Sequence, residues 1–143
     1  MPLHHAAICP RDLDASLRFY RDGRELEVMM DHTFTGAWRA LFDARSDELR
    51  SVFLGDPASP DAGVVELVDF TGGAAVGAPG AEPATGFFLL SFNVSDLDGT
   101  LDRLSRLGFG DDPRRIEVPG PHGPVEMATV RDPDGVVVEL IGR

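Results

Sequence analysis

The chain has 143 residues, of which 43% are hydrophobic, a length and composition typical of one globular domain. Its net charge of −11 and its lack of lysine exclude a basic nucleic-acid-binding surface, Schiff-base chemistry and a P-loop. Cys9 is the single cysteine, so no intrachain disulfide forms, and no apolar stretch approaches the roughly 20 residues that span a bilayer. Because the N-terminus does not resemble a secretory leader, we expect a cytoplasmic protein that binds neither nucleic acid nor membrane.

The first half of the chain predicts a strand, a helix and three more strands. Alternating apolar residues predict a strand over residues 4–9, with His5 on one face and His4 on the opposite face. Asp12 is the expected N-cap of a helix over residues 13–21. Three further strands are expected at residues 26–34, 49–54 and 63–70, and residues 38–44 form either a turn or a short helix.

A Gly-rich linker at residues 71–85 separates this half from a second one with the same plan. In the second half, Asp96 is the expected N-cap of a helix that Gly108 ends. The strands are expected at residues 87–94, 115–118, 125–130 and 136–141. We therefore divide a single domain, residues 1–143, into module one (1–70), the linker (71–85) and module two (86–143).

The two halves repeat each other in sequence. DAGVVELV at residues 61–68 aligns with DGVVVELI at residues 134–141, which places Glu66 on Glu139. In the same way HAAICPRDLDASLRFY, from the first half, aligns with LLSFNVSDLDGTLDRL from the second. Two equivalent modules packed about a pseudo-two-fold axis would bring Glu66 and Glu139 to face each other across a shared space.

His5, Glu66 and Glu139 are predicted on strands of this common face, and one imidazole with two carboxylates is a reasonable donor set for a divalent metal. An acid in the middle of a strand is costly to bury unless it is paired, hydrogen-bonded or metal-bound. The alternative is that both acids face solvent or pair with arginines, for which the candidates are Arg39, Arg50 and Arg131.

Four segments resemble the vicinal oxygen chelate superfamily, which includes glyoxalase, bleomycin resistance protein and extradiol dioxygenase. They are HAAICPRDLDASLRFYRDG, VVELV, GFFLLSFNVSDLDGTLDRL and RDPDGVVVELI, in this order. The resemblance implies an α+β fold in which two tandem βαβββ modules form curled mixed sheets around one cavity. It also implies a homodimer, with the cavity closed either within one chain or across the dimer.

In the metal-using members of this superfamily, the first and last strands of both modules supply four ligands. The resemblance places three of them at His5, Glu66 and Glu139, for a divalent ion such as Zn, Ni, Mn or Fe, and the fourth at Leu89. Leucine cannot bind a metal, so iron-dependent ring cleavage is not expected. Water or a substrate oxygen could complete the ligand set, as could His32 from the second strand.

The resemblance leads to two functional hypotheses. The first is a glyoxalase-like, metal-assisted lyase or isomerase that acts on a small organic substrate with vicinal oxygens, with Glu66 or Glu139 as the base. The second is a metal-free binding protein that sequesters an aromatic ligand, as bleomycin resistance proteins do. Acid–base catalysis by the two glutamates without a metal is a third possibility. By alternation, the predicted substrate contacts are Phe87, Leu89, Ser91 and Asn93, with Trp38 covering one end of the cavity.

Overall fold

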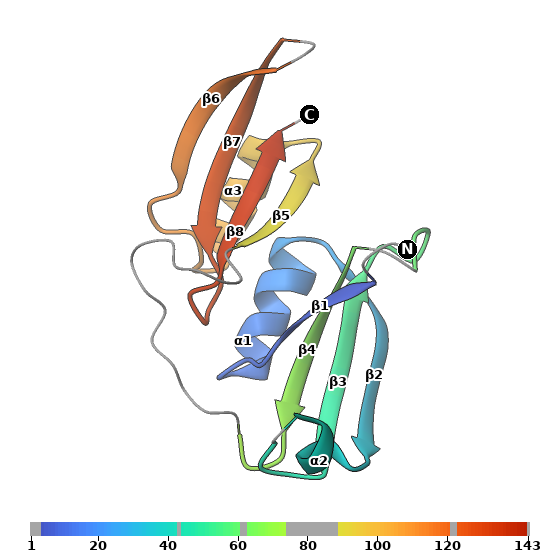
Figure 1. Ribbon diagram of the computed structural model, residues 1–143. Coiled ribbons are helices and arrows are strands. Elements are labelled where there is room, and N and C mark those ends of the chain that lie inside the picture. Colours follow the sequence, from blue (N-terminus) through green and yellow to red (C-terminus); the bar gives the residue numbers. More distant parts are fainter. Residues whose placement is uncertain (1–3, 43, 61–62, 74–88, 121–122, 143) are drawn as a thin grey trace. The chain divides into compact units, whose positions relative to one another are not determined.

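The structure is a computed structural model that describes residues 4–42, 44–60, 63–73, 89–120 and 123–142. The chain divides into two compact units, Met1–Gly77 and Ala78–Arg143, each with its own sheet and helix (Figure 1). Within the described ranges, every helix is too short or too polar to cross a membrane.

The first unit contains a four-stranded sheet in the order β1–β4–β3–β2. Its strands are β1 (His5–Ile8), β2 (Glu27–Thr35), β3 (Glu48–Gly55) and β4 (Val64–Phe70). The first strand of the unit pairs in parallel with the last, whereas the other neighbours are antiparallel. This pairing makes the sheet mixed and places β1 at its edge beside β4.

The helical segment of the first unit begins where the sequence predicts. The Asp12 carboxylate caps α1 (Leu13–Leu17) by accepting a hydrogen bond from the Ala15 backbone N–H at 3.0 Å. The segment then widens into a π-helical turn, η1 (Arg18–Gly23), so it ends two residues later than predicted. Phe19 and Tyr20 are both fully buried in this turn. A short helix, α2 (Trp38–Phe42), links β2 to β3.

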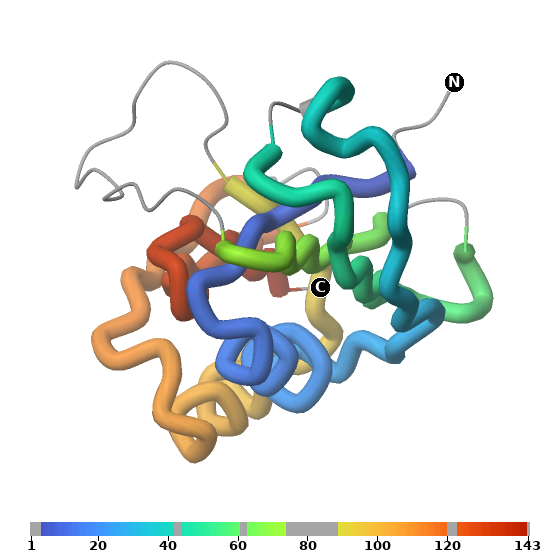
Figure 2. Tube along the Cα trace, turned by 90° about the horizontal axis from the view of Figure 1, so that it is seen from below, coloured from blue at the N-terminus to red at the C-terminus, as the bar shows by residue number. Residues whose placement is uncertain are grey.

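The two faces of the first sheet differ. Figures 1 and 2 show α1 and η1 together on one side of the sheet, and the side chains buried there include those of Val52, Leu54 and Leu67. Because strand side chains alternate, Glu66 on β4 and its cross-strand partner Phe53 on β3 lie on the opposite face. We call this the Glu66 face.

The second unit repeats the plan with β5 (Leu89–Val94), β6 (Arg114–Gly120), β7 (Gly123–Arg131) and β8 (Val137–Gly142), in the order β5–β8–β7–β6. The Asp96 carboxylate caps α3 (Leu97–Arg106) through the Gly99 N–H at 2.9 Å. The helix ends before Gly108, whose φ of 83° suits glycine. Val138 and Leu140 are fully buried, and Glu139, which lies between them, is on the other face of the sheet. We call that the Glu139 face.

The α+β class and the two repeated modules are therefore as predicted, with two open four-stranded mixed sheets. The hairpin of β6 and β7 is longer than predicted, because pairing continues past Pro119 and Pro124 to Gly120 and Gly123. Most of the predicted linker and the first two residues of the strand expected at 87–94 lie outside the described residues.

Candidate functional site

The Glu66 carboxylate is held at both of its oxygen atoms. The Ser51 hydroxyl donates to Oε1 at 2.6 Å, and His5 Nε2 lies 3.3 Å from Oε2. In the sheet register, Ser51 and His5 are diagonal neighbours of Glu66 on the strands to either side, within reach of its side chain. The Glu66 side chain is only 15% exposed and Ser51 is 2% exposed. This burial fixes the carboxylate in one orientation, with Oε2 directed at the imidazole.

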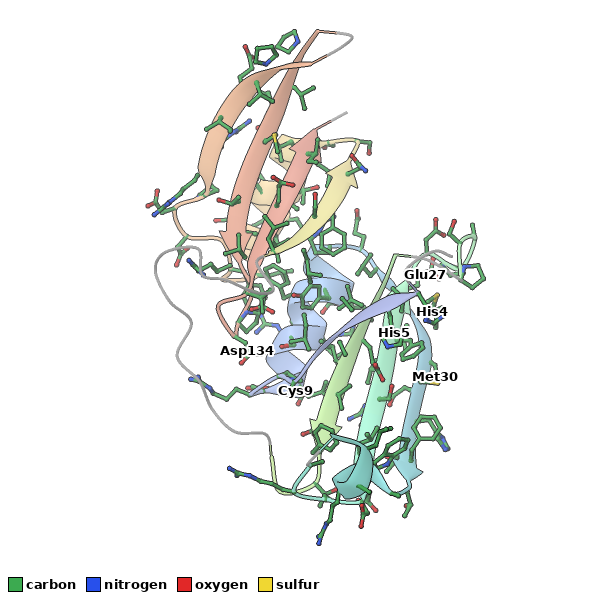
Figure 3. All side chains as sticks on the ribbon, viewed as in Figure 1. His4, His5, Cys9, Glu27, Met30 and Asp134 are labelled. Carbon is green, nitrogen blue, oxygen red and sulfur yellow. The ribbon has the colours of Figure 1, made fainter. Side chains whose placement is uncertain are left out.

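His5 also has a partner at its second ring nitrogen. His4 Nδ1 lies 2.9 Å from His5 Nδ1, and the two rings meet edge to face, with centroids 5.2 Å apart. The Phe53 ring packs against both imidazoles, at 5.3 Å from His5 and 5.8 Å from His4. Figure 3 shows His4 and His5 together at the start of β1. The expectation that His4 faces away is wrong, because β1 begins at His5 and strand alternation does not extend to His4.

Glu139 occupies the equivalent place in the second unit with a different partner. The Ser91 hydroxyl donates to Glu139 Oε2 at 2.7 Å, from the position directly opposite on β5. The corresponding residue of the first unit is Ala7, which lies opposite Glu66 and has no hydroxyl. Ser91 is exposed, so the Glu139 carboxylate is held by one donor at an open position.

Leu89 lies opposite Val137, as His5 lies opposite Val64 in the first unit. The imidazole–carboxylate pair of the first unit therefore has no equivalent at this place in the second. Among the predicted substrate contacts, Leu89, Ser91 and Asn93 lie on the Glu139 face, because they pair with alternate residues of β8 that include Glu139. The remaining predicted contact on this strand, Phe87, lies outside the described residues.

Trp38 lies in α2, at the end of the first sheet opposite to the start of β1 (Figure 1). Its indole N–H donates to the Phe34 carbonyl at 3.4 Å. With Ala37, Ala40 and Leu41, it lines a shallow, mostly apolar hollow. Trp38 is thus remote from His5 within its own unit, and its role as a substrate contact stays a prediction.

The arginines considered as partners for the two acids bind elsewhere. The contacts are Arg39 with Asp47, Arg50 with Asp31, and Arg131 with the Gly135 carbonyl. The alternative that Glu66 is neutralised by one of these arginines therefore finds no support in the described contacts.

The Cys9 thiol lies near two carboxylates. Desolvation raises the pKa of the Cys9 thiol, and the negative charges of Glu66 and Asp69 raise it further. Cys9 follows the end of β1, close to β4 (Figure 3). Strand alternation places Glu66 and Asp69 on opposite faces of the sheet, so Glu66 is the carboxylate of this pair that lies on the Glu66 face.

The donor set fits a divalent metal in part. His5 and Glu66 bring one nitrogen and one oxygen donor together, a combination that suits borderline ions such as Zn²⁺ and Ni²⁺. Across the described ranges, no three His, Cys, Asp or Glu side chains gather into a ready-made metal group. His32 lies opposite Ser51 on the Glu66 face, where its ring packs edge to face against Phe34 at 4.6 Å.

Sequence reasoning identified the acids and His5 but missed their partners. Ser51 and His4 carried no signal of their own in the sequence. For Ser51, the available clue was its alternation with Phe53 on a strand beside β4. For His4, it was the pair of adjacent histidines at the beginning of a strand.

Comparison with known proteins places this chain in a family. A family model described as the Glyoxalase/Bleomycin resistance protein/Dioxygenase superfamily matches residues 2–140. The chain is 38% identical to the lactoylglutathione lyase-like protein terB of Aspergillus terreus over 99% of its own length and 75% of that protein. It is 29% identical to a probable lactoylglutathione lyase of Synechocystis, over 99% and 95% of the two chains.

Solved structures of similar fold include glyoxalase proteins. A glyoxalase family protein from Bacillus cereus superposes with a TM-score of 0.77 at 18% identity, over 99% of this chain and 93% of that one. An E144Q mutant of glyoxalase I from Zea mays gives a TM-score of 0.71 at 22% identity, and here the chain spans 45% of the maize protein. The match over residues 2–140, together with the 38% identity, shows that the chain belongs to the Glyoxalase/Bleomycin resistance protein/Dioxygenase superfamily.

Proposed function

We propose that this chain is a glyoxalase-like lyase or isomerase that uses a divalent metal and acts on a small organic substrate with vicinal oxygens. The observation that carries the proposal is the His5–Glu66–Ser51 arrangement, in which a mostly buried carboxylate is oriented toward an imidazole nitrogen. A mostly buried negative charge is costly, and Glu66 has no arginine partner among the described contacts, so a bound cation would compensate its charge.

His5 and Glu66 would hold the ion, with Glu139 as a third donor and the position of Leu89 left to water or substrate. The resident ion would supply Lewis-acid polarisation of a substrate oxygen. We assign the proton-abstracting role to Glu139, because a single exposed hydroxyl holds it, whereas Glu66 is in contact at both oxygens. The names of the relatives, a lactoylglutathione lyase-like protein and a probable lactoylglutathione lyase, are in accord with a lyase that acts on a small organic substrate.

The experiment measures metal content and turnover of protein purified without a histidine tag. S-Lactoylglutathione, named by the relatives, is the first substrate to test, with Zn²⁺, Ni²⁺, Mn²⁺ or Fe²⁺ added. We expect metal-dependent turnover that Glu139→Gln abolishes. Glu117→Gln is the matched control, because Glu117 is an exposed strand residue of the same unit. It pairs across the hairpin with Glu126, so both side chains lie on the helix-covered face of the sheet and away from the Glu139 face.

A second candidate function is metal-free binding of a small molecule, and the apolar Leu89 is the observation that favours it. In that case no ion raises the melting temperature, and Glu139→Gln leaves ligand affinity unchanged. This outcome would refute the metalloenzyme. The homodimer and the cytoplasmic location stay predictions, and light scattering of the purified protein tests the former.

Leu89→His tests the metal site from the opposite direction, by restoring the missing donor. Changes among the groups that support a metal ligand alter affinity by about 10-fold to 100-fold, so a restored ligand should raise divalent-metal affinity at least that much. Leu89→Val is the control, because it keeps the side chain apolar. Unchanged affinity in folded Leu89→His protein would show that Leu89 does not face the ion.

A further inference from the structure

Both ring nitrogens of His5 have a partner, and the partner at Nδ1 is the neighbouring residue. His4 Nδ1 lies 2.9 Å from His5 Nδ1, while His5 Nε2 lies 3.3 Å from Glu66 Oε2. We infer that His4 is the positioning residue of His5. Its Nδ1 sets the ring orientation and tautomer of His5, so that Nε2 is presented to Glu66 and, on the proposed function, to the metal.

The carboxylate selects one arrangement of hydrogens in the metal-free protein. A lone pair on His5 Nε2 would be repelled by an ionised carboxylate oxygen 3.3 Å away, so a neutral His5 ring carries its hydrogen on Nε2. His5 Nδ1 is then an acceptor. The contact of 2.9 Å between the two Nδ1 atoms needs one hydrogen, which His4 Nδ1 supplies.

In the metal-binding state the contact between the two Nδ1 atoms is kept, but donor and acceptor exchange roles. A histidine that binds a metal through Nε2 presents a lone pair there and donates its Nδ1–H to a neighbouring acceptor. His5 would then donate to His4 Nδ1, and His4 would carry its hydrogen on Nε2. His4 is exposed, so this hydrogen exchanges with water. Each ring keeps one hydrogen in both states, so the pair changes tautomer without a change of charge.

The sequence repeat supports the assignment of the two histidines as one functional unit. His4 and His5 align with Phe88 and Leu89 in the second half, so both imidazoles are replaced there together. Because Phe53 packs against both imidazoles in the first unit, a purely hydrophobic role of His4 is the alternative to be tested.

Two substitutions at His4 separate hydrogen bonding from packing. His4→Phe keeps an aromatic ring against Phe53 but removes the nitrogen, whereas His4→Asn places an amide that can donate or accept near the former Nδ1. We expect His4→Phe to weaken Zn²⁺ and Ni²⁺ binding about 10-fold to 100-fold by calorimetry, and His4→Asn to retain most of the affinity. Equal affinities of wild type and a folded His4→Phe would overturn the inference.

A spectroscopic readout tests the pair independently of metal binding. Long-range ¹H–¹⁵N spectra of the metal-free protein should show the hydrogen of His4 on Nδ1 and that of His5 on Nε2, with both positions reversed after Zn²⁺ is added. If wild type binds none of the ions, the proposed metal function fails, and the metal-free spectrum alone decides the inference. Hydrogen on His4 Nδ1 then supports it, and hydrogen on His4 Nε2 refutes it.

Discussion

Glu66 and Glu139 occupy equivalent places in two repeated sheets, yet they are held by different neighbours. A buried hydroxyl from β3 and an imidazole from β1 hold Glu66, whereas an exposed hydroxyl from β5 holds Glu139. The strand pairing that presents each acid is the same in both units. The comparison shows that the repeat keeps the position of the carboxylate, while the residues around it determine which contacts hold it.

The Glu66 face and the Glu139 face also differ in the side chains that surround the two acids. The Glu66 face is rich in rings, because cross-strand pairing places Phe53, His32 and Phe34 there with His5. On the Glu139 face the strand pairing places Thr129 where the first unit has Phe53, Ile116 where it has His32, and Leu89 where it has His5. One backbone plan therefore supports an aromatic, imidazole-containing surface in one unit and a surface without rings at these places in the other.

The largest expected loss of stability comes from truncating a buried leucine in either unit, and it tests whether both units depend equally on their hydrophobic cores. Leu67 and Leu140 are fully buried at repeated positions, so Leu67→Ala and Leu140→Ala should each lower the free energy of unfolding by about 2–5 kcal/mol. Urea denaturation measures both, and Trp38 and Tyr20, the single tryptophan and tyrosine, give a fluorescence signal from the first unit. Leu41→Ala, at a side chain that is 66% exposed, is the control and should change stability by less than about 0.5 kcal/mol. A loss of less than about 1 kcal/mol in Leu67→Ala or Leu140→Ala would show that the two buried leucines do not contribute equally to stability.

The two serines sharpen the contrast between the acids. Ser51→Ala removes a buried donor to a charged group, so it should cost about 1.5–3 kcal/mol. Water can replace the hydroxyl in Ser91→Ala, and the loss there should stay below about 0.5 kcal/mol. Denaturant unfolding of the two variants at pH 7 makes the comparison. Equal losses would mean that the carboxylates are held equally firmly after all.

A smaller effect than that of the buried Ser51 is expected for an ion pair on the helix-covered face of the first sheet. Arg50 donates to both carboxylate oxygens of Asp31, at 2.8 and 2.7 Å, and this hydrogen bonding lowers the pKa of Asp31. Because the pKa of Asp31 is lower in the folded protein than in the unfolded chain, the ion pair stabilises the protein at pH values above the unfolded-state pKa. This stability is lost as the pH falls through the folded-state pKa. Because the side chains are 39% and 42% exposed, Asp31→Asn should cost at most about 1 kcal/mol at pH 7. The difference between wild type and variant should vanish in acid, and a constant difference across pH would contradict the ion-pair explanation.

Much of the fold was predictable from local signals in the sequence. Asp12 and Asp96 are helix caps where the sequence places them, and Gly108 ends the second helix. The widened turn at Phe19 and Tyr20 was not predictable, because helix periodicity does not show where an extra residue enters a turn.

The partners of the acids were less predictable than the acids themselves. Ser51 reaches Glu66 only because β3 and β4 pair in one register, and a shift of one residue would turn its hydroxyl to the other face. Ser91 was expected on the correct face, yet its bond to Glu139 depends on the parallel register of β5 and β8. His4 lies before the first residue of β1, where strand alternation does not apply.

The parallel pairing of first and last strands has a consequence for biosynthesis. Within the first unit, His5 is translated well before β4, so its strand has no partner until β4 has been made. Nearly the whole first unit must therefore be translated before the imidazole and the Glu66 carboxylate meet, and contacts so distant in the chain slow folding. A chain truncated before Phe70 would carry both histidines without a completed β4, so the His4–His5–Glu66 cluster marks a fully assembled first unit.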